Sequence, residues 1–298
     1  MNVREVIEPV EAPAVAPAFD VRLPEVLTSP FVFASPHSGR LYPDDMMAAA
    51  ALDAEAIRRS EDAFVDVLAG TAPAHGIPLI SVRYARAYID VNREPYELDP
   101  AMFEDALPSF ARSRTARVAA GLGSIARVVG EGQEIYARKL LFSDAHNRIE
   151  AVHKPYHQAL TDLLAQARAR FGMSVLVDWH SMPSAAAGGD AAHGRKAPDF
   201  VLGDRFGAAC SPAVTALVER ELEAMGYAVA RNAPYAGGYT TEFYGRPAAG
   251  AHALQIEMNR ALYLNEQTLE RRPGFARLGR DLERLYVALS TCNWRKFR

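Results

Sequence analysis

Two histidines, a glutamate and an arginine of this sequence lie at the ends of short apolar runs that have the length of buried strands. They are His37, His180, Glu257 and Arg93. Two imidazoles and one carboxylate, with a position left open for water, make a catalytic zinc site. A further carboxylate can move the proton of that water, and an arginine can hold an oxyanion or a substrate carboxylate. By residue type, these side chains suit metal-assisted hydrolysis.

Short apolar runs alternate with longer amphipathic segments along the chain. The runs predict strands over Phe31–Ser35, Leu79–Ala85, Tyr88–Val91, Ser174–Asp178, Asp199–Leu202, Ala228–Ala230 and Ala253–Met258. The amphipathic segments predict helices over Asp53–Leu68, about 137–171, Pro212–Met225 and Glu266–Ser290. This alternation is typical of an α/β domain with a mixed, mainly parallel, twisted central sheet flanked by helices. Ligands bind beyond the carboxyl ends of strands in such sheets, which is where the four candidate side chains stand.

The composition is that of an ordinary globular chain. Of the 298 residues, 49% are hydrophobic and 23% are charged, and the formal net charge is −3. No block of like charge stands out, which argues against nucleic-acid binding through a broad basic face and against a polybasic membrane anchor. No run of about 18 apolar residues predicts a membrane span. Cys210 and Cys292 are the two cysteines, too few for a disulfide scaffold or a cysteine-built zinc site.

Residues 1–24 are rich in Ala, Pro, Val and Glu, with no basic stretch before an apolar run. They predict an extended N-terminal arm and no secretory signal, so the expected location is the cytoplasm. No linker divides residues 25–298, which we expect to form one domain. Within it, the Ala/Gly-rich stretch Ser184–Lys196 predicts a mobile loop, and we hypothesise that this loop closes over the site.

Six strings that occur in order between Ser35 and Glu266 resemble those of the N-formylglutamate amidohydrolase family. They are SPHSGRLYP, YIDVNREPYELDP, KPYHQAL, DWHSMPS, APYAGGYTTEFYG and ALQIEMNRALYLNE. The family is similar in fold to the zinc carboxypeptidases and to the aspartoacylase/succinylglutamate desuccinylase enzymes. The resemblance implies a zinc-dependent amide hydrolase that splits N-formyl-L-glutamate into formate and L-glutamate, a late step of histidine breakdown.

The resemblance also implies a ligand set for one zinc ion, or another divalent ion, per chain. His37 and His180 match the family's metal histidines. For the third ligand, the register of the family's helical string selects Asp62. The phase of the expected helix instead favours Glu61, because Glu61 lies nearer to the apolar stripe. Both acids remain candidates at this point.

The remaining roles follow from the same resemblance. Glu257 matches the family's general base, and it would shuttle the proton of a zinc-activated water. Arg93, Asn92 and Arg86 match the positions that meet substrate carboxylates or the oxyanion. The loop Gly237-Gly238-Tyr239-Thr240 is similar to the family's substrate loop, where adjacent glycines let backbone N–H groups approach an anion. The expected partner is a small acidic N-acyl amino acid, and no pattern predicts an oligomeric state.

Two other functions fit the same residues. One is a related zinc amidase or carboxypeptidase that acts on another N-acyl amino acid or a short peptide. The other is a catalytically silent binding protein of the same fold. A second histidine pair, His153 and His157, lies four residues apart in a helical pattern. It would form either a metal pair or, as we expect, packing around Pro155 and Tyr156.

Overall fold

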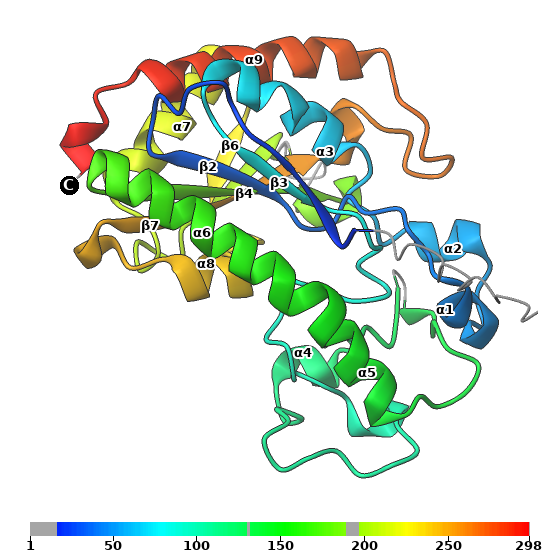
Figure 1. The fold of residues 1–298 in the computed structure, drawn as a ribbon. Helices are drawn as coiled ribbons and strands as arrows, with labels where there is room; N and C mark the ends of the chain where they lie inside the picture. Colours follow the sequence, from blue (N-terminus) through cyan, green and yellow to red (C-terminus); the bar gives the residue numbers. More distant parts are fainter. Residues whose placement is uncertain (1–16, 130–131, 189–196, 298) are drawn as a thin grey trace, which may run out of the picture.

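The computed structural model describes residues 17–129, 132–188 and 197–297, and a central sheet runs through them (Figure 1). Its strands are β1 (Phe19–Arg22), β2 (Phe31–Ser35), β3 (Leu79–Val82), β4 (Ser174–Met182), β5 (Phe200–Gly203), β6 (Val229–Arg231) and β7 (Ala251–Asn259). The strand order is β1-β3-β2-β4-β7-β5-β6. Strand β1 is antiparallel to β3 and β5 is antiparallel to β7, whereas the other pairs are parallel. The predicted α/β fold with a mixed, mainly parallel sheet is confirmed.

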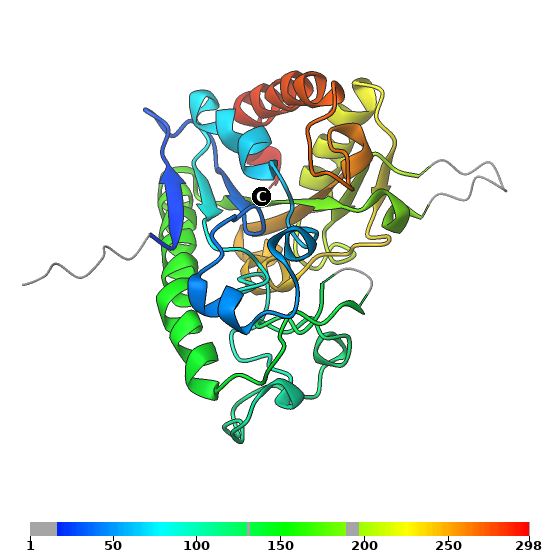
Figure 2. The same ribbon diagram turned by 90° about the vertical axis from the view of Figure 1, so that its right-hand side faces the viewer.

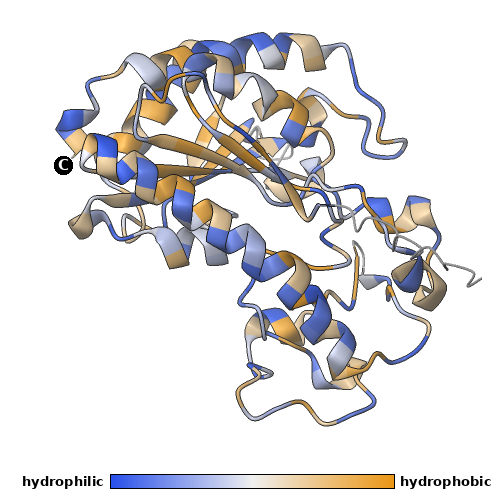
Figure 3. Cartoon of the chain, viewed as in Figure 1, coloured by the Kyte–Doolittle hydropathy of each residue, from blue (hydrophilic) through white to orange (hydrophobic). Residues whose placement is uncertain are grey.

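Some of the described helices cover the two faces of this sheet, and the others lie beside or below it (Figure 1). The described helices are α1 (Asp44–Ala49), α2 (Ala54–Arg58), α3 (Val65–Leu68), α4 (Ala116–Ala119), α5 (Phe142–Arg148), α6 (Lys154–Phe171), α7 (Pro212–Ala224), α8 (Tyr239–Tyr244) and α9 (Gly274–Thr291). Helices α3, α7 and α9 lie on one face, and α6 and α8 lie on the other (Figure 1). The apolar faces of the helices point to the sheet and their polar faces point away (Figure 3). In the described residues, no helix is long and apolar enough to cross a membrane.

The period-two alternation of the strands divides the core into two layers. Phe31 and Phe33 of β2 enter the cluster beneath α7 and α9, whereas Val32 and Ala34 enter the cluster beneath α6. All four side chains are fully buried. Burial on both faces explains why this strand reads as a continuous apolar run.

The same alternation places polar side chains on one face near the ends of β4 and β7. In register, Asp178 pairs with Gln255 and His180 pairs with Glu257. Residues two apart on a strand point to the same face, so these four side chains share the α6 side of the sheet. The site therefore begins where the apolar core of two central strands ends.

The expected strand Tyr88–Val91 is wrong, because this segment is a turn. Ile89 and Val91 are fully buried, which accounts for the strand-like apolar pattern. The backbone, however, bonds to loops and not to a strand: the Ile89 N–H donates to Ala85, and the Asp90 N–H donates to Ser124. Below the sheet, a lobe of residues 100–129 and 132–141 follows this segment in the chain and lies near α1 and α2 (Figure 2).

Three expected helices have different limits in the structure. The helix expected over Glu266–Ser290 begins only at Gly274, as α9. The helix expected over Asp53–Leu68 is interrupted between α2 and α3, and Phe64 before α3 has a left-handed φ of 64°. The segment expected from about 137 starts at α5 and continues through a π turn, Ile149–His153, into α6. Pro155 lies just after this π turn, at the start of α6.

Parts of two other expectations lie outside the described residues. Of the N-terminal arm, residues 1–16 are not described, and residues 17–24 contain β1 at the edge of the sheet. Of the loop Ser184–Lys196, Ser184–Ala187 forms a 3-10 turn, and residues 189–196 are not described.

Helix α9 offers a direct test of this packing. Leu285 is fully buried beneath it, whereas Val287 on the same helix is 46% exposed. We expect Leu285→Ala to lower the free energy of unfolding by about 2–5 kcal/mol, because it removes buried methyl groups and leaves a cavity. Val287→Ala should change it by less than about 0.5 kcal/mol. Urea unfolding of both variants checks this, and equal losses would contradict the assigned helix face.

Candidate metal centre and its cavity

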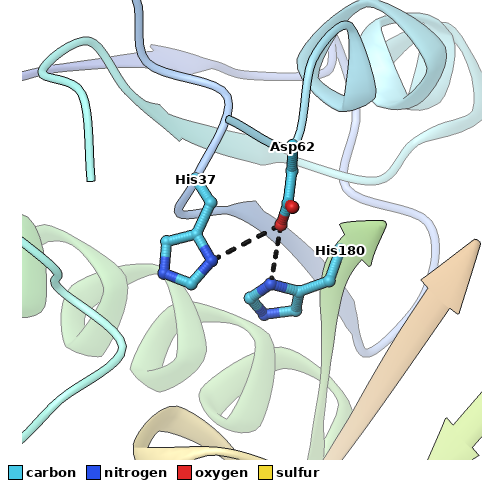
Figure 4. A group of neighbouring side chains, drawn as sticks. All are labelled: His37, Asp62 and His180. Carbon is cyan, nitrogen blue, oxygen red and sulfur yellow. Dashed lines mark hydrogen bonds and ion pairs between the residues drawn. The ribbon is translucent and has the colours of Figure 1, made fainter. Parts of the chain in front are cut away.

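Three side chains from distant parts of the chain converge on one point (Figure 4). His37 follows β2, His180 belongs to β4, and Asp62 stands in the break between α2 and α3. The Asp62 Oδ2 atom lies 3.4 Å from His37 Nδ1 and 3.1 Å from His180 Nδ1. One ligand atom from each residue lies within 4.8 Å of the others, and all three residues are buried. The geometry brings Asp62, and not Glu61, to the two histidines.

Each imidazole is held from behind by a second carboxylate. His37 Nε2 lies 2.7 Å from Asp90 Oδ1, and His180 Nε2 lies 2.9 Å from Asp178 Oδ2. A carboxylate accepts, so each Nε2 carries the proton and each Nδ1 faces Asp62. Metal-binding histidines in proteins are oriented by such outer carboxylates, which fix the tautomer.

The donor set fits a divalent cation. His37 Nδ1 is buried and makes no hydrogen bond within the described residues, so a lone pair points at the convergence point. Burial would lower the pKa of His180, but Asp178 and Asp62 raise it well above its ordinary value. A cation can replace the proton that these carboxylates hold on that imidazole. Two imidazole nitrogens and one carboxylate oxygen are the ligands of many catalytic zinc sites.

Asp62 is fixed through its other oxygen. The Arg260 guanidinium donates to Asp62 Oδ1 at 3.0 Å, and the Ser181 hydroxyl donates to the same atom at 3.2 Å. Burial would raise the pKa of Asp62, but the hydrogen bond from His180 and the charges of the two imidazoles hold it well below its usual range. The carboxylate is therefore ionised with Oδ2 turned to the imidazoles.

Glu61 is occupied elsewhere. Its carboxylate accepts from the Tyr42 hydroxyl at 2.7 Å and from Arg58 Nε at 3.0 Å. These partners lie beside α1 and α2, away from the imidazoles. Helix phase misplaced Glu61 because the helix has ended before this residue, so the 3.6-residue period no longer applies.

Glu257 stands beside the histidine group as the cross-strand neighbour of His180. It is 6% exposed and accepts a hydrogen bond from Gln255 Nε2 at 2.8 Å. Burial raises its pKa to about 7, while the charges of His180 and the nearby arginines oppose the rise. A carboxyl group with such a pKa exchanges protons readily near neutral pH.

The histidine group and Glu257 line a cavity of about 690 Å³. Arginines are frequent in its wall: Arg59, Arg86, Arg93, Arg117 and Arg260. The lobe contributes an apolar side that includes Leu122, Val128 and Ile135. The cavity therefore combines a buried acid–base group with a cationic wall, which suits an anionic ligand.

The two arginines that the sequence analysis assigned to substrate lie on this wall. Arg86 Nη2 contacts Asp90 Oδ2 at 2.7 Å, and Arg93 Nη2 lies 3.8 Å from the same oxygen. Arg93 also donates to the carbonyls of Asn92 and Leu122. Burial would raise the pKa of Asp90, but Arg93, His37 and Arg86 hold it well below its usual range.

Asn92 and the expected substrate loop form one unit. Asn92 Nδ2 lies 3.1 Å from His180 Nε2, and the Thr240 N–H donates to Asn92 Oδ1. Gly237 and Gly238 line the cavity. A Cβ on Gly238 would lie 2.7 Å from Asn92 Oδ1, so this close approach requires glycine. The side chain of Tyr239 packs against the imidazoles of His153 and His157, outside the cavity wall.

Three functional candidates escaped the sequence analysis: Asp90, Asp178 and Arg260. Asp178 stands two residues before His180, so both point to one face of β4. A search for carboxylates two positions from a strand histidine would have found it. Asp90 and Arg260 carry no such local signal, because their partners His37 and Asp62 lie far away in the sequence.

Comparisons with known proteins place the chain in one family. The model of the family described as N-formylglutamate amidohydrolase matches residues 29–264. The N-formylglutamate deformylase of Pseudomonas aeruginosa is 29% identical, over 80% of this chain and 83% of that protein. The N-formylglutamate deformylase of Pseudomonas putida is 28% identical, over 80% of this chain and 82% of that protein.

Solved structures give the same result. The crystal structure of N-formylglutamate amidohydrolase from Ralstonia eutropha JMP134 has a TM-score of 0.85 and 40% identity, over 92% of this chain and 97% of that one. A protein from Agrobacterium tumefaciens, 17% identical with a TM-score of 0.63 over 92% of this chain and 96% of its own, shares the fold. The resemblance seen in the sequence is confirmed, and the chain belongs to the N-formylglutamate amidohydrolase family.

Proposed function

We propose that this protein is a metal-dependent amide hydrolase that converts N-formyl-L-glutamate into formate and L-glutamate. The observation that carries the proposal is the buried His37–Asp62–His180 group in the wall of an arginine-lined cavity. The names of the relatives support the substrate, because the two Pseudomonas proteins and the Ralstonia protein are named for N-formylglutamate.

His37, Asp62 and His180 would hold the ion, which we propose to be zinc, with one per chain. When bound, such an ion lowers the pKa of water and polarises a carbonyl group. The residues around the group have a separate task. Asp90 and Asp178 keep the Nδ1 atoms turned inward, and Arg260 keeps one oxygen of Asp62 away from them.

Glu257 is the proposed general base. Its carboxylate takes a proton from the attacking water and returns it to the nitrogen of the leaving amine. A pKa of about 7 suits both halves of this task, since the group accepts and releases a proton at similar cost. Gln255 holds one of its oxygens and so restricts how the carboxylate turns.

The arginines of the wall select the substrate. N-Formyl-L-glutamate carries two carboxylates, and Arg86 and Arg93 offer planar guanidinium donors that match carboxylate geometry. Both guanidinium groups share the single carboxylate of Asp90, so an uncharged analogue would leave their combined charge only partly compensated, which penalises its binding. We also propose that one of the two stabilises the oxyanion that forms during attack.

Metal dependence is the first test. We expect extensive chelation followed by removal of the chelator to lower kcat/KM for N-formyl-L-glutamate by at least ~100-fold, and added zinc to restore it, because electrophilic stabilisation is lost. Metal analysis of the purified protein provides the control. Full activity without any bound divalent ion would refute the proposal, and a protein that binds zinc but hydrolyses nothing would be a silent binding protein.

The role of Glu257 is tested by an isosteric change. Glu257→Gln should lower kcat by at least ~100-fold, since an amide cannot accept the proton of water. Zinc content should remain at the level of the unaltered protein. Glu242→Gln, at a carboxylate that is 58% exposed and pairs with Arg205, serves as the matched control. Equal rates for the two variants would exclude Glu257 as the base.

Charge selection is tested by comparing substrates. We expect Arg86→Gln to reduce the ratio of kcat/KM for N-formyl-L-glutamate over N-formyl-L-glutamine by at least ~10-fold, which corresponds to one charge-assisted hydrogen bond. Arg40→Gln is the control, because Arg40 pairs with Asp66 outside the cavity wall. An unchanged ratio would remove Arg86 from substrate recognition.

The same substrate panel decides between formyl and larger acyl groups. If the unaltered protein hydrolyses N-acetyl or N-succinyl glutamate as fast as the formyl compound, the related N-acyl amidase is the correct assignment.

A further inference from the structure

A second pair of imidazoles lies behind the site, on the first turns of α6. His153 and His157 are four residues apart, so they share one face of the helix. Their ring centroids are 4.4 Å apart. His153 is 2% exposed, and His157 is sheltered between α6 and the rings of Tyr239 and Tyr244. The proposed reaction uses neither residue.

Both imidazoles are directed at backbone carbonyls of one short segment. His153 Nε2 lies 2.9 Å from the carbonyl oxygen of Arg93, and His157 Nε2 lies 2.8 Å from that of Val91. A carbonyl oxygen can only accept, so each imidazole must donate from Nε2. These Nε2 nitrogens carry protons and have no lone pair for a metal. A metal pair would have to use the Nδ1 nitrogens, and His157 Nδ1 already faces the Tyr244 hydroxyl at 2.9 Å.

The environment maintains that protonation pattern. His157 Nδ1 lies 2.9 Å from the Tyr244 hydroxyl, which supplies a hydrogen for the nitrogen that remains an acceptor. Burial lowers the pKa of His157 to about 3 and also lowers that of His153. Both rings are therefore neutral donors over the ordinary pH range.

The segment that they hold carries the outer contacts of the metal group. Asp90 orients His37, and Asn92, which lies between the two held carbonyls, donates from Nδ2 to Asp178, the carboxylate that orients His180. The segment is a turn and lacks the hydrogen-bond ladder of a strand. Helix α6, packed along β2 and β4, supplies a rigid support in place of a neighbouring strand.

We propose that His153 and His157 are positioning residues of the active site: their N–H groups fix the carbonyls of Arg93 and Val91, and thereby set Asp90 and Asn92 against the two metal-binding histidines. This inference rests on the proposed metal site. This role differs from simple packing. At either position, a side chain of similar size without an N–H donor would fill the same space but would leave the carbonyl that the histidine holds without its donor.

Zinc affinity of the purified protein is the measurement that separates these explanations. We expect His153→Leu and His157→Leu to weaken zinc binding by about 10–100-fold in a competition titration with a chromophoric chelator, the usual effect of losing outer-shell support. His153→Gln and His157→Gln, which keep an N–H donor at a similar reach, should recover most of the affinity. His146→Leu is the matched control, on α5 at a half-exposed imidazole that bonds to Tyr96.

Each outcome is decisive. Zinc affinity and kcat/KM equal to those of the unaltered protein in both Leu variants would overturn the inference. So would equal losses in the Leu and Gln variants, because the loss would then come from packing. If a Leu variant does not fold, His157→Asn, with its shorter amide, replaces it and should bind zinc more weakly than His157→Gln. An unaltered protein that binds no zinc would instead overturn the proposed function itself.

Discussion

The site depends on a carboxylate that is buried and shared by two imidazoles. Asp62 is 1% exposed, and a buried carboxylate is tolerated only when charges and hydrogen bonds satisfy it. Each of its two oxygens has its own partners. Oδ1 accepts hydrogen bonds from Arg260 and Ser181, and Oδ2 faces the imidazoles of His37 and His180. Removal of one partner would leave charge uncompensated in a low-dielectric interior, which costs more than the contact itself contributes. The elements that carry these residues are therefore constrained together.

The position of His180 also depends on the two central strands, β4 and β7, which are buried along nearly their whole length. They pair in parallel over nine positions. A slip of one residue would turn His180 and Glu257 to the opposite face of the sheet. The apolar alternation on both faces fixes the register, and with it the positions of His180 and Glu257. The packing of these two strands in the core therefore also fixes where His180 and Glu257 lie.

The sequence allowed much of this to be predicted, within definite physical limits. The strands that precede His37 and His180 were predictable because both-face burial leaves an apolar run that ends at a polar residue. The turn around Asp90 was not, because burial of Ile89 produces the same pattern whether the neighbouring backbone is a strand or a loop. The choice of Asp62 over Glu61 depended on where a helix ends. Beyond that end, the Asp62 N–H donates to the carbonyl of His37, a tertiary bond that no local pattern encodes.

The charges on the cavity wall favour an anionic ligand. The chain as a whole is slightly acidic, with a formal net charge of −3. The cavity wall reverses this sign, since it carries five arginines against the carboxylates Asp62, Asp90 and Glu257. A local positive potential inside an acidic molecule concentrates small anions at the site and repels cations. Arg86 and Arg93 both approach one oxygen of Asp90, so neither charge is fully compensated there. The proposed substrate, with its two carboxylates, would compensate the charge that Asp90 leaves uncompensated on Arg86 and Arg93. Its selection would then depend on Asp90, the same carboxylate that orients His37.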